Sequence, residues 1–276
     1  MNYIDNFFTP KSIAIIGASR SKDKLGYQIL KNLVDSGYNG NIYPINPKAN
    51  SILGIKSYAS VLNIKSTIDL AVFIVPKEII KFAFSETVKK KIKSSIIITA
   101  GFGEIGKEGK ALEQELLLMS KQSGTHIIGP NCLGVIDTYT PMNVSFANGN
   151  PGKKNLAVVS QSGAMCTAIL DWAIKNCIGF SKFVSLGNKI DIDESDIFEA
   201  FKKDKNTKVV LGYFEGIEDG KRFIKNARQL SKVKPIIAIK AGQSTEGAKA
   251  ASSHTGALTS DSEAVLAPLR KQALFM

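Results

Sequence analysis

The sequence predicts an α/β protein with two doubly wound domains, each a parallel sheet covered by helices on both faces. The chain has 276 residues, which is long for one domain. Short continuous apolar segments alternate with helical patterns, as expected for strands buried on both sides. The alternation stops in a segment rich in Asn, Pro and Gly at 145–155 and then begins again. We therefore predict domains at 1–145 and 146–276.

In the first domain, the strands are the apolar segments. Residues 12–19 read as a strand that ends in small residues, and 26–37 have the period of an amphipathic helix. Further strands are predicted at 41–48, 70–76 and 94–102, with amphipathic helices between the later ones.

The second domain repeats this pattern. The predicted strands are 156–160, 180–187, 208–216 and 235–242. Helices are expected to begin near Ser162, Ser195 and Gly220. Both domains open with a strand followed by a turn of small residues, so the same kind of ligand-binding edge is expected in each.

The composition is that of a soluble globular protein, with 44% hydrophobic and 22% charged residues. No apolar segment approaches the roughly 20 residues that cross a bilayer, and residues 1–10 lack the pattern of a secretory signal. The three cysteines form no CxxC pair, so neither disulfides nor a metal site is expected. These features predict a cytoplasmic protein without membrane contact.

The formal net charge of +12 raises the question of nucleic acid. The lysines are scattered over helices and loops, and no basic stripe with interleaved aromatic residues accompanies them. We therefore expect no nucleic-acid partner. An anionic small molecule makes better use of the positive field.

A turn of small residues follows the first strand and is the first candidate site. It consists of Gly17, Ala18, Ser19 and Arg20. Such a turn into a helix offers backbone N–H groups to phosphate. The GxGxxG pattern of dinucleotide folds is absent, and Lys48 stands near the end of the second strand where an acid would hold a ribose. A lysine at this position suits a nucleotide that is phosphorylated on its ribose, either CoA or NADP. The alternative is that Gly17 only forms a tight packing turn and that Lys48 is only a solvated side chain.

The second candidate site centres on His254, which lies in a loop of small polar residues with room for a bulky adduct. Ser162 and Gly163 end one strand and open a helix, where N–H groups and the helix dipole attract an anion. Glu215 ends another strand, where its carboxylate could hold one imidazole nitrogen and leave the other nucleophilic.

Each of these residues also has a plainer interpretation: an exposed histidine, an ordinary helix cap and a solvated acid. A Ser-His-Asp hydrolase is a further alternative, because SQSGA resembles the nucleophile elbow GxSxG. The first glycine of that elbow is replaced by Ser160, which speaks against a hydrolase.

Several motifs together resemble those of ADP-forming acyl-CoA synthetases, relatives of the succinyl-CoA synthetase α subunit. They occur in the same order and rough spacing as in that family: SIAIIGASRSKDKLGYQILKNL, YPINPK, VPKE, ITAGFGE, GPNCLGVID, VSQSGAM, YFEGIEDG, IKAG and SSHTGALTSD. The resemblance covers nearly the whole chain. It implies a Rossmann-like CoA-binding domain followed by a flavodoxin-like domain that carries a phosphohistidine.

The resemblance also implies roles for individual residues. His254 would carry phosphate, Glu215 would orient its ring, and Ser162 with Gly163 would receive the phosphoryl group. The residues implied to line CoA are Gly17, Ala18, Ser19, Arg20, Lys48, Val75, Pro76 and, close to the thiol, Asn131.

In that family an ATP-grasp module binds the nucleotide. The short segment after His254 cannot hold one. We therefore expect either that an ATP-grasp β-type subunit or domain supplies nucleotide and Mg²⁺, or that the chain is a truncated version that binds CoA without completing the cycle. The expected reaction interconverts acyl-CoA, phosphate and ADP with a small carboxylic acid, CoA and ATP. The alternative is a non-catalytic sensor of CoA or acyl-CoA.

Overall fold

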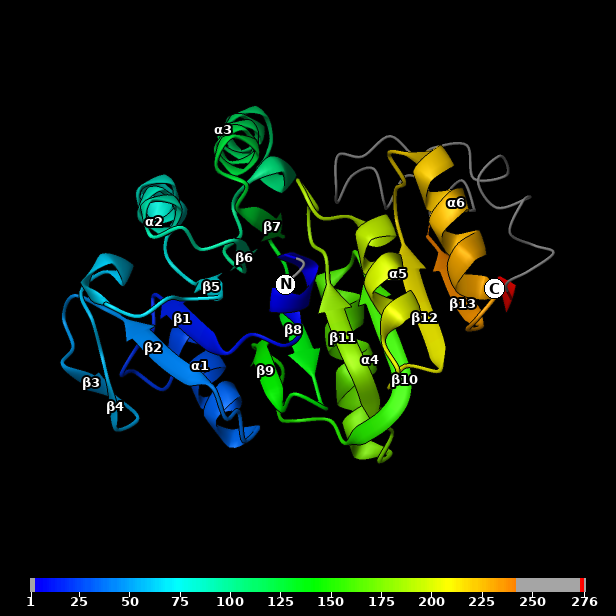
Figure 1. Ribbon diagram of the computed structural model, residues 1–276, viewed down its shortest axis with the longest axis horizontal. Coiled ribbons are helices and arrows are strands. Elements are labelled where there is room, and N and C mark those ends of the chain that lie inside the picture. The colour runs from blue at the N-terminus through cyan, green and yellow to red at the C-terminus, as the bar shows by residue number, and fades with distance from the viewer. Residues whose placement is uncertain (1–2, 242–273, 276) are drawn as a thin grey trace.

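The structure, a computed structural model, describes residues 3–241 and 274–275 and contains two large sheets with helices packed against them (Figure 1). The first sheet has five parallel strands in the order β2-β1-β5-β6-β7. Their bounds are β1 Ser12–Ile16, β2 Asn41–Ile45, β5 Leu70–Phe73, β6 Ser94–Ile97 and β7 His126–Ile128. Counted along the chain, this is the 2-1-3-4-5 order of doubly wound sheets, whose switch point lies between β1 and β5.

Helices cover both faces of this sheet, as Figure 1 shows. Alternate residues of β1 face opposite sides because successive strand side chains point apart. Ile13 and Ile15 join the core with α1 (Leu25–Asp35), whereas Ala14 and Ile16 join the core with α2 (Lys77–Lys89) and α3 (Lys107–Ser123). The small elements η2 (Val61–Asn63), η3 (Gly103–Ile105), β3 (Ser51–Ile52) and β4 (Ile55–Lys56) lie in the connections.

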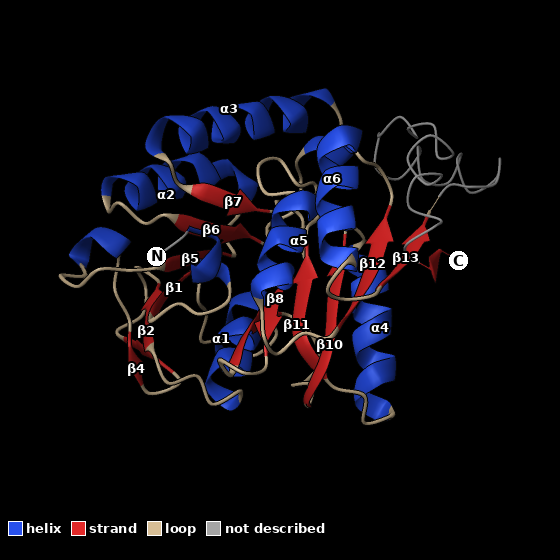
Figure 2. Cartoon of the chain, turned by 45° about the vertical axis from the view of Figure 1, so that its right-hand side comes forward, coloured by secondary structure: helices blue, strands red, loops and turns tan. Residues whose placement is uncertain are grey.

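The second sheet has seven strands in the order β14-β13-β12-β10-β11-β8-β9. The parallel strands are β10 Lys153–Ser160, β11 Phe180–Ser185, β12 Val209–Phe214, β13 Ile236–Lys240 and β14 Leu274–Phe275. They repeat the 2-1-3-4-5 order, with the switch point between β10 and β12. In Figure 2, α4 (Gly163–Lys175) lies on one side, and α5 (Glu194–Lys203) and α6 (Gly220–Ser231) lie on the other. The predicted fold class is confirmed.

Two short antiparallel strands complete the second sheet, and they come from before the predicted boundary. β8 (Gly134–Asp137) pairs with β11, and β9 (Met142–Ser145) pairs with β8. Neither strand was expected. The boundary between 145 and 146 stays a prediction, but the chain already enters the second sheet at Gly134.

One of the three hydrophobic clusters spans both sheets. A single cluster contains Ile15 of β1, Val144 of β9 and Val159 of β10, together with residues of α1, α5 and α6. The buried Asn32 side chain of α1 donates two hydrogen bonds of 2.8 Å at the end of β9. Their acceptors are the carbonyls of Ser145, the last residue of β9, and of Ala147, two residues further on. These contacts pack the two sheets directly against each other.

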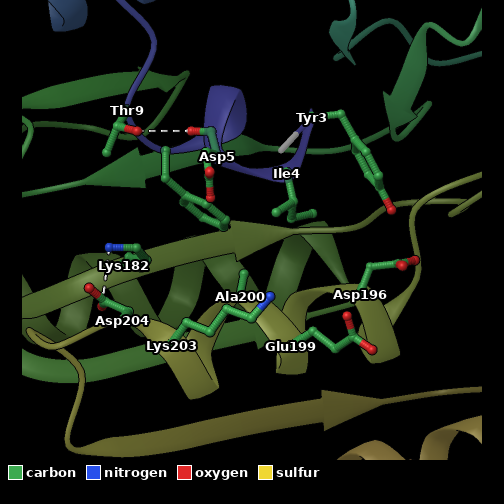
Figure 3. A pocket seen from close by; sticks show the side chains of 11 residues that line it. Tyr3, Ile4, Asp5, Thr9, Lys182, Asp196, Glu199, Ala200, Lys203 and Asp204 are labelled. Carbon is green, nitrogen blue, oxygen red and sulfur yellow. Dashed lines mark hydrogen bonds and ion pairs between the residues drawn. The ribbon is translucent and has the colours of Figure 1, made fainter. Parts of the chain in front are cut away.

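The N-terminal segment η1 (Tyr3–Phe7) closes a small cavity of about 180 Å³ against β11 and α5 (Figure 3). Lys182 is buried there and pairs with Asp137 and Asp204 at 2.8 and 3.1 Å. Its charge is matched within the protein, so we assign this cavity to packing of the terminus. No helix in the described ranges, 3–241 and 274–275, is long and apolar enough to span a membrane.

Candidate functional site

The turn after β1 has a backbone conformation and a packing that require glycine. Gly17 has φ +96°, and a Cβ there would lie 2.2 Å from the carbonyl oxygen of Ile74 after β5. Gly26, in the first turn of α1, would place a Cβ 2.0 Å from the Gly17 carbonyl oxygen. The start of α1 thus packs directly on the turn at the switch point. Gly26 was not among the predicted site residues, although a glycine at the start of the helix predicted at 26–37 is a signal of close backbone approach.

The end of β2 is tied to the same turn. Asn46 donates a 2.7 Å hydrogen bond to the Ala18 carbonyl and accepts one of 2.8 Å from the Lys48 backbone N–H. The Arg20 guanidinium in turn donates to the Lys48 carbonyl at 3.3 Å. Both cationic side chains are exposed beside the turn. The structure therefore brings Ala18, Arg20 and Lys48 together, as an anionic nucleotide would need.

Val75 and Pro76 lie on the other side of the switch point. Val75 is buried, and a Cβ on Gly17 would lie 3.0 Å from its side chain. Pro76 is exposed and directly precedes α2 as its N-cap. Ser19 is half-buried in the turn, where its hydroxyl accepts a hydrogen bond of 3.0 Å from the Ser21 N–H. All the residues predicted to line CoA, except Asn131, thus lie around the carboxyl end of β1.

Asn131 lies at the carboxyl edge too, but after β7 at the far side of the first sheet. Its backbone is in the left-handed region, with φ 57°, and its N–H donates to the Thr99 carbonyl at 3.0 Å. The side-chain amide donates to Asn188 Oδ1 at 3.2 Å. Asn188 follows β11, so Asn131 marks the place where the carboxyl edges of the two sheets meet.

The second candidate site is the switch point of the second sheet. Ser162 is the N-cap of α4, and its hydroxyl accepts a 3.3 Å hydrogen bond from the Met165 N–H. A Cβ on Gly163 would meet no atom within 4 Å among the described residues, so none of these residues packs against the helix start at Gly163. The dipole and N–H groups of a helix start stabilise an anion by about 0.3 to 1 kcal/mol at an exposed site and up to about 2 kcal/mol when partly buried. This arrangement suits a phosphoryl group.

Gln161, which was not among the predicted site residues, links this helix start to the neighbouring strand end. Its Oε1 accepts hydrogen bonds from the backbone N–H groups of Glu215 and Gly216 at 2.8 and 2.9 Å. Its Nε2 donates to the Gly216 carbonyl at 2.8 Å and to Glu194 Oε2 at 3.1 Å. The side chain thereby makes all four bonds that an amide can make. It fixes the backbone that carries Glu215 relative to Ser162.

A buried ion pair supports the same turn. Lys189 Nζ lies 3.3 Å from Glu194 and donates to the Gly216 carbonyl at 2.7 Å. Glu194 is only 1% exposed. Burial raises the pKa of the Glu194 carboxyl, and the Lys189 ammonium opposes that rise. Lys189 and Gln161 thus both donate a hydrogen bond to the Gly216 carbonyl, and Gln161 also accepts one from the Gly216 N–H.

Glu215 is placed by its backbone. Its N–H is bound by Gln161, and its carbonyl accepts a 2.8 Å hydrogen bond from Lys240 Nζ. Burial lowers the pKa of Lys240, and the nearby Glu215 carboxylate opposes that effect. His254 lies outside the described residues, so its position relative to Glu215 stays a prediction. Among the described residues, no group of three or more His, Cys, Asp or Glu side chains could hold a metal ion.

Comparisons with known proteins identify both halves of the chain. Residues 11–138 match the family described as CoA binding domain, and residues 153–275 match the family described as succinyl-CoA ligase like flavodoxin domain. These two descriptions agree with the predicted order of domains.

The chain is also similar in sequence to ADP-forming acetate–CoA ligases. The chain is 51% identical, over 91% of its length, to the acetate–CoA ligase [ADP-forming] of Methanocaldococcus jannaschii, of which it covers 35%. It is 44% identical over 98% of its length to the acetate–CoA ligase [ADP-forming] I subunit alpha of Pyrococcus furiosus, of which it covers 60%. The chain thus spans less than two thirds of these relatives.

A solved structure is also similar along the whole chain. It is the dinucleotide forming acetyl-coenzyme A synthetase 1 of Ca. Korarchaeum cryptofilum, in complex with phosphate and ADP. The TM-score is 0.96 and the identity 37%, with coverage of 100% of this chain and 60% of that one.

Proposed function

Because the chain belongs to the family of ADP-forming acyl-CoA synthetases related to the succinyl-CoA synthetase α subunit, we propose that it is the part of such an enzyme that binds CoA and carries the phosphohistidine. The observation that carries this proposal is the switch point of the second sheet. There an open helix start at Ser162 and Gly163 is locked by Gln161 to the turn that bears Glu215. A CoA sensor would not require this second site.

In the proposed reaction, phosphate attacks the thioester carbon of acyl-CoA. The C–O bond forms, the C–S bond breaks, and the phosphate proton passes to the leaving thiolate, which gives acyl phosphate and CoA. The neutral imidazole of His254 then attacks phosphorus and releases the carboxylic acid as its carboxylate. The helix start at Ser162 and Gly163 stabilises the transferred phosphoryl group, and Glu215 holds the second ring nitrogen.

Phosphohistidine must next meet ADP. We propose that an ATP-grasp β-type subunit or domain supplies the nucleotide and Mg²⁺ and that the acid is a small carboxylic acid. Names such as subunit alpha among the relatives support a separate partner. The absence of a candidate membrane helix among the described residues is consistent with the cytoplasmic location that we propose.

ATP synthesis tests the proposed function. The chain, combined with an ATP-grasp partner, should form ATP from ADP, phosphate and an acyl-CoA, and a panel of short acyl-CoAs identifies the acid. Omission of either phosphate or acyl-CoA should stop ATP formation, because both supply atoms of the acyl phosphate. Binding of CoA without ATP formation from any acyl-CoA would refute the enzyme and favour a sensor.

A second prediction concerns the ribose 3′-phosphate of CoA. Lys48→Ala should weaken CoA binding by about two- to fivefold, the range of an exposed ion pair. The same substitution should leave binding of dephospho-CoA unchanged, since that ligand lacks the phosphate. Calorimetry measures both affinities, and Lys175→Ala in the last turn of α4 is the matched control. If Lys48→Ala weakens both ligands equally, Lys48 does not contact the 3′-phosphate.

A further inference from the structure

The loop that follows β11 lies directly on the turn that carries Asn131. The Asn188 N–H donates to the Pro130 carbonyl at 2.9 Å, and the Ile190 N–H donates to the Gly129 carbonyl at 3.1 Å. Gly187 has φ +58°, and a Cβ there would lie 2.2 Å from the Pro130 oxygen. No side chain fits between the two segments. Asn188, in the loop after β11 of the second sheet, is therefore held next to Asn131 by these backbone hydrogen bonds.

The side chain of Asn188 has only one acceptable amide orientation. Its Nδ2 donates to Glu104 Oε2 at 2.7 Å and to Glu113 Oε1 at 2.6 Å. Ionised carboxylates only accept hydrogen bonds, so a rotated amide would bring its oxygen against two acceptors. The carbonyl oxygen Oδ1 must consequently face Asn131.

The two carboxylates are themselves held in place. Glu104 also accepts a hydrogen bond from the Gly101 N–H. Glu113 reaches the cluster because residue 103 is glycine: a Cβ there would lie 2.6 Å from Glu113 Oε2. On the other side of the loop, Lys189 binds Glu194 and the Gly216 carbonyl. The side-chain amide of Asn188 is thus held by Glu104 and Glu113 and does not depend on the Asn131 side chain for its orientation.

This arrangement determines the orientation of the Asn131 amide. Since Asn188 offers an acceptor, Asn131 must present its Nδ2, which donates to Asn188 Oδ1 at 3.2 Å. Within the described part of the chain, Asn131 Oδ1 accepts no hydrogen bond and is available to a ligand. An acceptor at this place matches a thiol, whose S–H is a weak donor.

We propose that Asn188 is a positioning residue for acyl transfer, which keeps Asn131 Oδ1 directed at the thiol of CoA. This inference rests on the proposed function. In the direction of acyl-CoA formation, the sulfur attacks the carbonyl carbon of acyl phosphate. The C–S bond forms, the C–O bond to phosphate breaks, and the thiol proton leaves with the phosphate as HPO₄²⁻. Asn131 orients the S–H group and takes no proton.

The test is the exchange of labelled CoA into acetyl-CoA, or into the acyl-CoA that the wild type accepts, in the presence of inorganic phosphate. It uses the chain with its ATP-grasp partner. Asn188→Ala should lower kcat for exchange by about ten- to a hundredfold, because a small misplacement of a reacting group has effects of this size. The KM for CoA should change by less than about threefold, because the ribose and diphosphate contacts lie elsewhere. Phosphorylation of His254 from ATP should keep its wild-type rate.

A double-mutant cycle separates positioning from general damage. If Asn188 acts through Asn131, the variant with Asn131→Ala and Asn188→Ala should exchange no more slowly than Asn131→Ala alone. Glu113→Gln, whose amide can donate as well as accept, relaxes the orientation of Asn188 and should cause a smaller loss in the same step. Asn176→Ala, at the exposed end of α4, is the control and should exchange at the wild-type rate.

Wild-type exchange in Asn188→Ala, or strictly additive effects in the cycle, would overturn the inference. So would an equal loss of exchange and of phosphorylation from ATP, because that pattern indicates a structural role. If Asn188→Ala does not fold, Glu113→Gln decides by the same two readouts. A wild-type protein that binds CoA but shows no exchange refutes the proposed function itself, and the inference falls with it.

Discussion

His254→Ala is expected to abolish incorporation of phosphate into the chain, either from acyl-CoA with inorganic phosphate or from ATP with the partner. The substitution removes the only proposed nucleophile for phosphorus. Affinity for CoA should change by less than about twofold, since the two sites lie on different sheets and distant changes seldom couple. Radiolabelled phosphate measures incorporation, and the label should be acid-labile and alkali-stable, as expected for a phosphoramidate.

The chain offers a matched control, because it contains only two histidines. His126 stacks on Tyr3 and lies 3.2 Å from Asp191, away from both switch points. His126→Gln should keep the full label. An acid-stable label, or a label retained in His254→Ala, would assign the chemistry to another residue.

Gln161→Leu is expected to have the second-largest effect. The substitution removes four hydrogen bonds from a side chain that is 7% exposed. It leaves the N–H groups of Glu215 and Gly216 without their acceptor. Because each buried unsatisfied group costs about 1 to 3 kcal/mol, we expect the free energy of unfolding to fall by about 2 to 4 kcal/mol. Denaturant unfolding measures this change.

The same variant should also slow phosphorylation of His254 by more than about tenfold, since Glu215 loses its fixed relation to the helix start at Ser162. Gln122→Leu, on the exposed surface of α3, is the control and should change the unfolding free energy by less than about 0.5 kcal/mol. A Gln161→Leu protein as stable and as active as the wild type would show that the turn is held by other contacts.

Periodicity located the main elements of the fold because the strands are nearly continuous apolar segments. The strand predicted at 70–76 corresponds to β5 at Leu70–Phe73, and the helix expected near Ser162 begins at Gly163. The glycine turn after β1 and the helix start of α4 could be identified as ligand sites because doubly wound sheets bind ligands at such edges. Composition and period suffice for features of this kind.

The pairing of strands that are distant in the sequence could not be predicted from periodicity. The segment that forms β8 and β9 lies before the Asn-, Pro- and Gly-rich linker and was therefore placed with the first domain, yet it pairs with β11 of the second sheet. The burial of Lys182 could not be predicted either, because a lysine within an apolar strand is normally expected at the surface. It is buried here because Asp137 and Asp204 match its charge. Both features depend on residues that are distant in the sequence.

The supporting shell of the site was missed for the same reason. Gln161 stands between Ser160 and Ser162, but only the fold brings the Glu215 turn within reach of its amide. Asn188 likewise becomes informative only when Glu104 and Glu113 are found around it. A sequence motif indicates which residues could act on a ligand, whereas the contacts that orient them come from tertiary structure.

In the proposed reaction, every phosphoryl group passes through His254. The most direct measurement is to incubate the wild-type chain with acyl-CoA and inorganic phosphate, without any nucleotide, and to map the modified residue by mass spectrometry under alkaline conditions. We expect a phosphoryl group on His254 that appears only when acyl-CoA and phosphate are both present and disappears when CoA and the carboxylic acid are added. A phosphoryl group on a serine of the 160–162 turn, or none on His254 while acyl-CoA is consumed, would contradict it.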